Sequence, residues 1–159
     1  MQPLHLWPIK TNNKNDMTKI GMLTVLFLCG WSLWGWATGE GDQIIGQWYS
    51  EDRNQKYEIF QSGTTYSARL IWMAEPNHPD GSPKLDENNP DPAKRRQPLV
   101  GMTVFWGLTY RNGSWVNGKT YSPKQGRTAD CSLRLRSNNE LELTGSVGFV
   151  KRSRIWKRA

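Results

Sequence analysis

Residues 128–136 read TADCSLRLR and residues 141–147 read LELTGSV, with the sequence SNN between them at residues 137–139. Apolar side chains occupy alternate positions of the first segment from Cys131 onward, and polar side chains occupy the positions between them. Strict alternation is typical of a half-buried β-strand, because successive side chains point to opposite faces of a sheet. Ser and Asn favour turns. These residues therefore predict an antiparallel hairpin.

The same reading predicts strands over most of the remaining chain after residue 43. They fall at residues 44–49, 56–60, 65–73, 99–110, 115–121 and 152–158. Turn sequences rich in Gly and Asn separate several of them, and no helix of ordinary length is predicted. About eight short strands indicate an all-β fold, a small antiparallel β-barrel or sandwich, and closure into a barrel removes exposed edges. Such a barrel is either filled by side chains or holds one small ligand.

Within the strand predicted at residues 65–73, alternation places four apolar side chains on one face, namely Tyr66, Ala68, Leu70 and Trp72. The strand predicted at residues 99–110 carries Val104 and Trp106 in the same kind of alternation. We expect Trp72 and Trp106, together with Trp115 of the next predicted strand, to supply apolar surface to the inside of the barrel.

Residues 75–98 form one long Pro-rich loop, in which no regular period survives. Pro92 preceded by Asp91 predicts a single helical turn over residues 93–96, with Asp91 as its cap. Long loops in compact domains are often functional. We expect this loop to lie over one mouth of the barrel as a lid or rim.

The N-terminal part has the pattern of an export signal. Residues 20–36 read IGMLTVLFLCGWSLWGW and carry no charge, while Lys19 precedes them. A basic start, an apolar run and small residues after it are typical of a cleaved secretory signal peptide, and an uncleaved membrane anchor is the alternative. We therefore assign residues 1–37 to an upstream extension and signal peptide, with the true start at Met17, and residues 38–159 to one barrel domain. The expected location is periplasmic or secreted.

Composition excludes several classes of site. The chain has 159 residues, a formal net charge of +7, two Cys and two His. Cys29 lies in the apolar N-terminal run, so Cys131 would be alone after cleavage, which excludes a disulfide framework and a Cys-rich zinc site. We predict no catalytic set, no metal and no cofactor. An exported protein is also not expected to bind nucleic acid.

An ordered series of short motifs resembles a known bacterial family. It comprises Gly46-x-Trp48, Trp72-Met73-Ala74-Glu75-Pro76, Asp80-Gly81-Ser82-Pro83-Lys84, Asp86-Glu87-Asn88-Asn89-Pro90-Asp91, Pro98-Leu99-Val100-Gly101-Met102, Tyr121-x-Pro123-x-x-Gly126 and Arg154-x-Trp156. Their order and spacing resemble the family catalogued as domain of unknown function 2147. This resemblance implies a small secreted or periplasmic protein and implies no reaction.

A second resemblance concerns the two ends of the barrel sequence. Gly46-x-Trp48 near the start, with Arg154 and Arg158 near the end, is similar to the lipocalin-like (calycin) pattern. In that pattern a Trp of the first strand packs under an Arg of the last strand and closes one end of the barrel. The resemblance therefore implies a lipocalin-like barrel.

Eight residues are candidates for a ligand-binding site: Trp72, Asp86, Asn89, Arg95, Arg96, Trp106, Trp115 and Tyr121. Aromatic side chains favour pockets, and Arg95 or Arg96 would anchor an anionic group. Asx residues such as Asp86 and Asn89 also make turns, and their spacing is not that of an EF-hand.

The leading hypothesis is a non-enzymatic periplasmic module that binds a small apolar or anionic ligand or acts as a scaffold. One alternative is an interaction module for a protein partner of the cell envelope, which would use the long loop and the basic patches. Another is a hydrolase with Asp86 as general base. We expect a monomer or a weak dimer.

Overall fold

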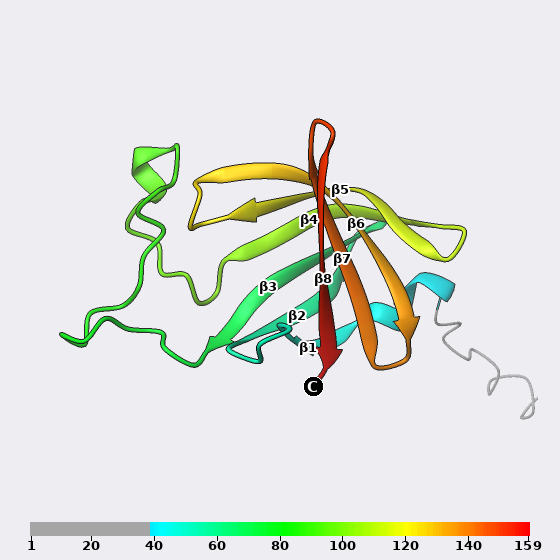
Figure 1. Ribbon diagram of the computed structural model, residues 1–159, viewed down its shortest axis with the longest axis horizontal. Helices are drawn as coiled ribbons and strands as arrows, with labels where there is room; N and C mark the ends of the chain where they lie inside the picture. Colours follow the sequence, from blue (N-terminus) through cyan, green and yellow to red (C-terminus); the bar gives the residue numbers. More distant parts are fainter. Residues whose placement is uncertain (1–38) are drawn as a thin grey trace, which may run out of the picture. The chain divides into compact units, whose positions relative to one another are not determined.

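The computed structural model describes residues 39–159, which form a closed antiparallel β-barrel (Figure 1). Its elements are η1 (Glu40–Ile44), β1 (Gly46–Tyr49), β2 (Gln55–Ser62), β3 (Thr65–Met73), η2 (Pro92–Lys94), β4 (Thr103–Arg111), β5 (Ser114–Ser122), β6 (Arg127–Ser137), β7 (Glu140–Val147) and β8 (Val150–Arg158). Each strand pairs with the next along the chain, and β8 pairs back to β1. The predicted all-β fold, a small antiparallel barrel of about eight strands, is confirmed.

The hairpin predicted from residues 128–147 is the β6–β7 pair. Leu135 lies opposite Leu141, and Leu133 lies opposite Leu143. The predictions for residues 1–37 lie outside the described residues. Among residues 39–159, no helix is long and apolar enough to cross a membrane.

The inside of the barrel is filled by side chains. The core consists of Ile44, Trp48, Tyr57, Ile59, Tyr66, Ala68, Leu70, Phe105, Leu108, Trp115, Cys131, Leu133, Leu141 and Trp156. At its centre the rings of Tyr57 and Trp156 stack with their centroids 4.1 Å apart, and Phe105 packs 5.9 Å from Trp156. These large rings therefore occupy the middle of the barrel, where they pack against one another.

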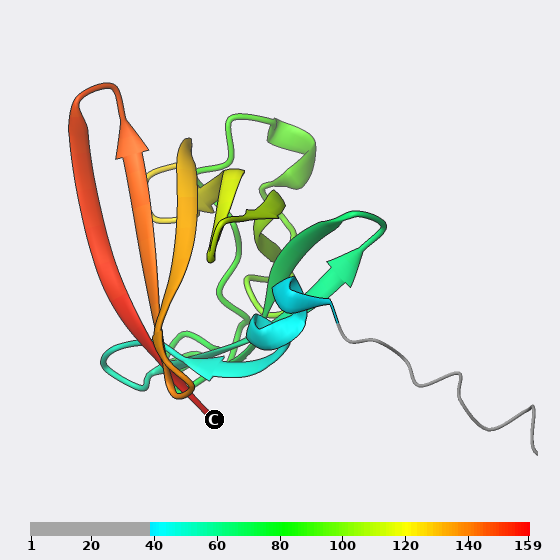
Figure 2. The ribbon, with the colours of Figure 1, turned by 90° about the vertical axis from the view of Figure 1, so that its right-hand side faces the viewer.

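One end of the barrel is closed by η1, which Figure 2 shows in front of the strands. The Trp48 indole donates to the Ile44 carbonyl at 2.8 Å, and the Trp115 indole donates to the Gly41 carbonyl at 3.0 Å. The guanidinium of Arg158 lies 4.2 Å from the Trp48 ring centroid and donates to the Gln43 carbonyl. The arrangement implied by the lipocalin-like pattern is therefore present, with Arg158 as the arginine.

The opposite end is less completely closed. Since β1 has only four residues, it pairs with β8 only through Trp48–Arg158 and Tyr49–Lys157. The part of β8 before these residues has no partner strand on that side among residues 39–159. The β7–β8 hairpin therefore projects away from the barrel body (Figures 1 and 2). We call this end of the barrel the mouth.

Two β-bulges place Trp72 and Trp106 on the outer face of the barrel, whereas the sequence predicts the inner face. In β3, Leu70 pairs with Tyr57 and Trp72 pairs with the next residue of β2, Lys56, so Ile71 is an extra residue. The bulge turns Trp72 to the outer face, where it is exposed and packs edge-on against Tyr49.

In β4 a similar irregularity reverses the expected alternation. Phe105 and Leu108, three residues apart, are both completely buried, and Gly107 between them has a φ of +74°. Trp106 is consequently exposed on the outside. The prediction that Trp72 and Trp106 line the inside is wrong, because strict alternation does not anticipate an inserted residue.

Candidate functional site

The long Pro-rich loop has a defined structure of its own. Bridges join Asn77 to Pro83 and Leu85 to Pro98, and the Leu99 amide donates to the Lys84 carbonyl at 3.0 Å. The predicted helical turn is present as the 3₁₀ helix η2, although it begins at Pro92 rather than at residue 93. Its predicted cap is also present, since the Asp91 carboxylate accepts from the Ala93 amide at 3.0 Å.

Four of the predicted site residues meet where this loop packs against the end of β5. Asp86 is only 1% exposed, and its carboxylate accepts from the Tyr121 hydroxyl at 2.9 Å and from the Asn89 amide at 2.5 Å. Arg95 donates through Nε to the Asn89 carbonyl at 2.8 Å. Burial and the neighbouring Asp86 carboxylate raise the pKa of Tyr121 to about 12. These side chains satisfy one another, so we interpret them as the internal support of the loop.

The loop is also attached to the β5–β6 turn. The Asn88 amide donates to the carbonyls of Pro123 and Lys124, both at 3.3 Å. Gly126 has a φ of +60°, and a Cβ there would lie 2.0 Å from the Asn88 carbonyl oxygen. The hydrogen bonds hold the loop at the edge of the mouth, and the missing side chain of Gly126 allows the close approach.

The remaining predicted site residues lie apart from this cluster. Trp115 is 1% exposed at the closed end, where it packs against Tyr66 and Tyr110. Arg96 is exposed and forms no ion pair with residues 39–159. Trp72 and Trp106 lie on the outer face, as described above.

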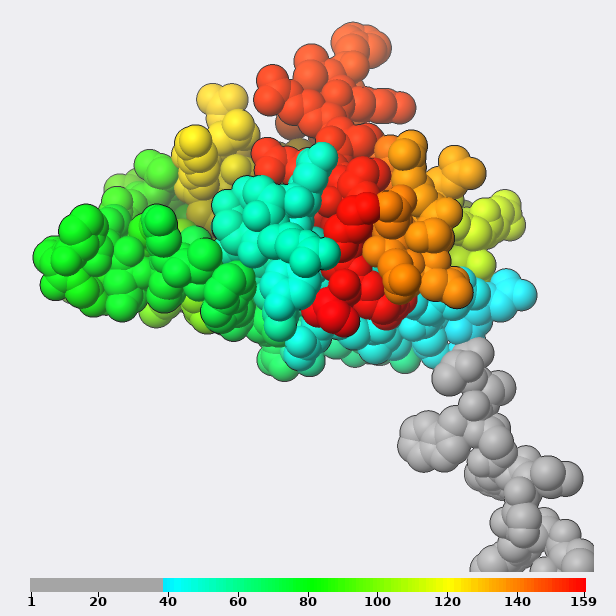
Figure 3. Space-filling model, turned by 60° about the horizontal axis from the view of Figure 1, so that its bottom comes forward, coloured from blue at the N-terminus to red at the C-terminus, as the bar shows by residue number. Residues whose placement is uncertain are grey.

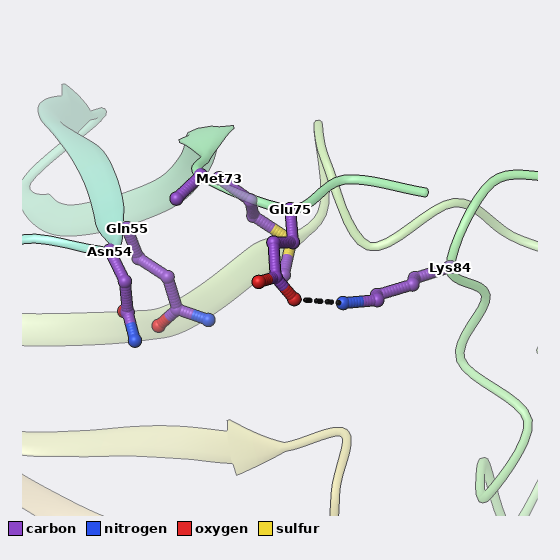
Figure 4. A pocket seen from close by; sticks show the side chains of 6 residues that line it. Asn54, Gln55, Met73, Glu75 and Lys84 are labelled. Atoms are coloured by element: carbon purple, nitrogen blue, oxygen red, sulfur yellow. Dashed lines mark hydrogen bonds and ion pairs between the residues drawn. The ribbon is translucent and has the colours of Figure 1, made fainter. Parts of the chain in front are cut away.

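A pocket of about 200 Å³ opens at the mouth, between the β1–β2 connection and the start of the long loop (Figure 4). We call it the mouth pocket; its lining is Asn54, Gln55, Met73, Ala74, Glu75 and Lys84. The amides of Asn54 and Gln55 lie side by side, and Lys84 reaches across to Glu75, with 3.4 Å between Nζ and Oε2. The Glu75 side chain is largely exposed, so this ion pair is weak.

An arginine faces the same region from β8. Leu133 of β6 is buried in the core, Leu143 lies opposite it, and Arg154 lies opposite Leu143. Residues directly opposite one another share a face of the sheet, so Arg154 belongs to the inner face. It is nevertheless exposed, and among residues 39–159 it has no ion-pair partner.

Tyr57 adjoins the mouth pocket and lies close enough to Arg154 to feel its charge. Its hydroxyl donates to the side-chain carbonyl of Gln55, which lines the pocket. Burial raises the pKa of Tyr57 to about 12, and the positive charge of Arg154 acts in the opposite direction. The mouth thus combines amide groups, a phenol and two cationic side chains, Lys84 and Arg154.

None of the eight candidate residues selected from the sequence belongs to this group. Arg154 carried a usable signal, because it stands two positions before Trp156 on the same strand and therefore on the same face. In β2, Gln55 and Tyr57 carried the same kind of signal, because each stands two positions from another residue that faces inward. The convergence of β2, β3, β8 and the long loop could not be seen from local patterns.

No group of three or more His, Cys, Asp or Glu in residues 39–159 could hold a metal ion. Cys131 is buried, and this burial raises the pKa of its thiol to about 12, which disfavours the nucleophilic thiolate.

Comparisons with known proteins agree with this geometry. The model of the family described as "Uncharacterized protein conserved in bacteria (DUF2147)" matches residues 46–158. The chain is similar to protein HP1028 of the human pathogen Helicobacter pylori, described as belonging to the lipocalin family, with 26% identity and a TM-score of 0.62. That match covers 72% of this chain and 82% of the other.

A redesigned β barrel is also similar, at 14% identity and a TM-score of 0.42, over 74% of this chain and 93% of that one. No match was found among curated proteins.

Proposed function

Since this chain belongs to the DUF2147 family of uncharacterised bacterial proteins and folds as a lipocalin-like barrel, we propose that it is an exported, non-enzymatic module that binds a small anionic ligand. The proposed site is the mouth pocket together with Tyr57 and Arg154. The observation that carries the proposal is Arg154, an arginine on the inner face of the barrel without an ion-pair partner among the described residues.

The chemistry of the site suits a carboxylate or phosphate group. A guanidinium presents a planar fork of donors that can bind two oxygens of one anionic group. Lys84 can exchange its weak contact with the exposed Glu75 for a ligand anion. The amides of Asn54 and Gln55 can donate to or accept from the uncharged part of the ligand.

The same geometry argues against a large apolar ligand. The inside of the barrel is occupied by Tyr57, Phe105 and Trp156. The mouth pocket measures about 200 Å³, whereas pockets for drug-sized ligands measure about 300–1,000 Å³. The ligand is therefore a small metabolite-sized anion that is held near the surface.

Export is part of the proposal and rests on the sequence. The uncharged residues 20–36 follow Lys19 and precede the first residues of the barrel. A protein with this leader would meet its ligand in the periplasm or outside the cell.

Thermal unfolding in the presence of single ligands tests the proposal. The full chain is screened against small carboxylates and organic phosphates, and a ligand at 100 times its Kd should stabilise the barrel by about 2.7 kcal/mol. Arg154→Gln should remove the shift in unfolding temperature produced by the best ligand. Arg96→Gln, a change of an exposed arginine in the long loop, should retain it.

Two outcomes would overturn the proposal. One is a screen in which no anion shifts the unfolding temperature. The other is a ligand whose shift is the same in wild type and in Arg154→Gln.

A further inference from the structure

The tip of the β7–β8 hairpin presents a compact apolar surface to solvent. Val147 is 67% exposed, Phe149 is 106% exposed and Val150 is 64% exposed. Gly148, with a φ of +58°, makes the turn between the two strands. In Figure 3 this hairpin stands out from the body of the molecule, so its tip is free to approach a flat surface. We call residues 147–150 the apolar tip.

Such a tip is unfavourable in water. Fully burying a side chain such as Phe or Val is favourable by about 1.5–3 kcal/mol relative to leaving it exposed. Isolated exposed apolar residues are common, but here three of four consecutive residues are exposed and apolar, at the most projecting part of a hairpin. No other described residue covers them.

Two cationic residues follow the apolar tip directly. Lys151 and Arg152 are both exposed, and neither forms an ion pair with any residue among 39–159. The acidic side chain on the neighbouring strand, Asp130, lies opposite Ser146 and is paired with Lys119 at 2.5 Å. The base of the tip therefore carries uncompensated positive charge.

We propose that the apolar tip docks the protein on an anionic lipid bilayer. Val147, Phe149 and Val150 enter the boundary between headgroups and acyl chains, as the apolar faces of interfacial segments do. Lys151 and Arg152 then lie at the level of the lipid phosphates, where each cation near the surface contributes attraction to anionic lipid.

Charge decides between this occupant and a second copy of the chain. Two hairpins meeting tip to tip would bring two pairs of Lys151 and Arg152 together, and like charges repel. An anionic bilayer supplies both the apolar volume and the opposite charge. The docking is independent of the proposed ligand, because the tip does not line the mouth pocket.

A fluorophore at the tip tests the proposal in the full chain, where the apolar N-terminal run could also bind vesicles. An environment-sensitive nitrobenzoxadiazole label is attached at Val147→Cys in a background in which both native cysteines are replaced, Cys29→Ser and Cys131→Ala, so that it reports this position alone. The control label is at Thr64→Cys, an exposed residue in the β2–β3 turn at the opposite end of the barrel. The probes are vesicles of phosphatidylcholine alone and of phosphatidylcholine with 30% phosphatidylglycerol.

The label at residue 147 should shift to shorter wavelength with the anionic vesicles, and the label at residue 64 should not. Phe149→Ser should raise the half-saturating lipid concentration by about tenfold or more, because the burial of one aromatic ring is lost. Changing both Lys151 and Arg152 to Ala should raise the half-saturating lipid concentration by about fivefold for each charge removed. Added salt should also raise it, because it screens the attraction to anionic lipid.

Three results would overturn the proposal. They are an unshifted label at residue 147, an equal shift at residue 64, and a shift that appears with increasing protein concentration in the absence of vesicles. The last result would identify a second copy of the chain as the occupant. An equal response to neutral and anionic vesicles would also contradict the role given to Lys151 and Arg152.

Discussion

Asp86 offers the sharpest test of how the long loop is held, because its carboxylate is buried and has two donors. In Asp86→Ala the Tyr121 hydroxyl and the Asn89 amide lose their acceptor. Hydrogen bonds to charged groups contribute about 1.5–3 kcal/mol each, and the partly exposed Tyr121 can recover some of its loss by bonding to water. We therefore expect the attachment of the loop to weaken by about 2–4 kcal/mol.

Native-state hydrogen exchange measures this loss locally. The reporter is the Leu99 amide, which donates to the Lys84 carbonyl within the loop. A loss of 2–4 kcal/mol corresponds to exchange that is about 30- to 1,000-fold faster. Asp80→Ala is the matched control, since Asp80 lies in the same loop but is exposed and bonds only to Ser82.

Unchanged exchange at Leu99 in Asp86→Ala would refute this reasoning. The carboxylate would then not support the loop, and the hydrolase alternative, in which Asp86 is a general base, would gain weight. An equal acceleration in Asp80→Ala would also refute it, because burial would not distinguish the two acids.

Three further predictions follow from single contacts. In urea unfolding, Gly126→Ala should lower the free energy of unfolding by about 1–3 kcal/mol more than Gly63→Ala does. Gly63 has a similar positive φ but open space around it, so equal losses would exclude the clash as the cause. Arg158→Lys should lower stability by about 1–2 kcal/mol, since Lys cannot both stack on Trp48 and donate to several carbonyls; an unchanged unfolding midpoint would contradict this. Burial raises the pKa of Tyr57 from its ordinary value of 10.0 to about 12, so the free energy of unfolding should fall as pH rises through this interval, and less so in Tyr57→Phe; parallel pH profiles for the two proteins would contradict it.

The architecture was readable from the sequence because most of its determinants are local. Alternation in residues 128–136 depends only on the pleat of a strand, and it predicted the β6–β7 pair correctly. The relation of Trp48 to Arg158 was available only through the lipocalin-like resemblance, since these residues are far apart in the chain. Closure of the barrel followed from the need to remove exposed edges.

The site was less readable because it depends on bulges and on long-range convergence. One inserted residue, Ile71, moved Trp72 to the outer face. Asp86 and Tyr121 were selected separately, and only the structure shows that they bond to each other. The Asx residues of the loop turned out to support its backbone, as their turn propensity allows.

Native mass spectrometry tests the ligand-binding proposal most directly. The full chain is expressed with its N-terminal segment, recovered from the cell without denaturation, and compared with a variant carrying Arg154→Gln and Lys84→Gln. We predict that the wild type carries a small anionic molecule in a one-to-one ratio and that the variant has lost it. A wild type without any bound molecule, or a variant that retains the same molecule at the same occupancy, would contradict an anion site at the mouth of the barrel.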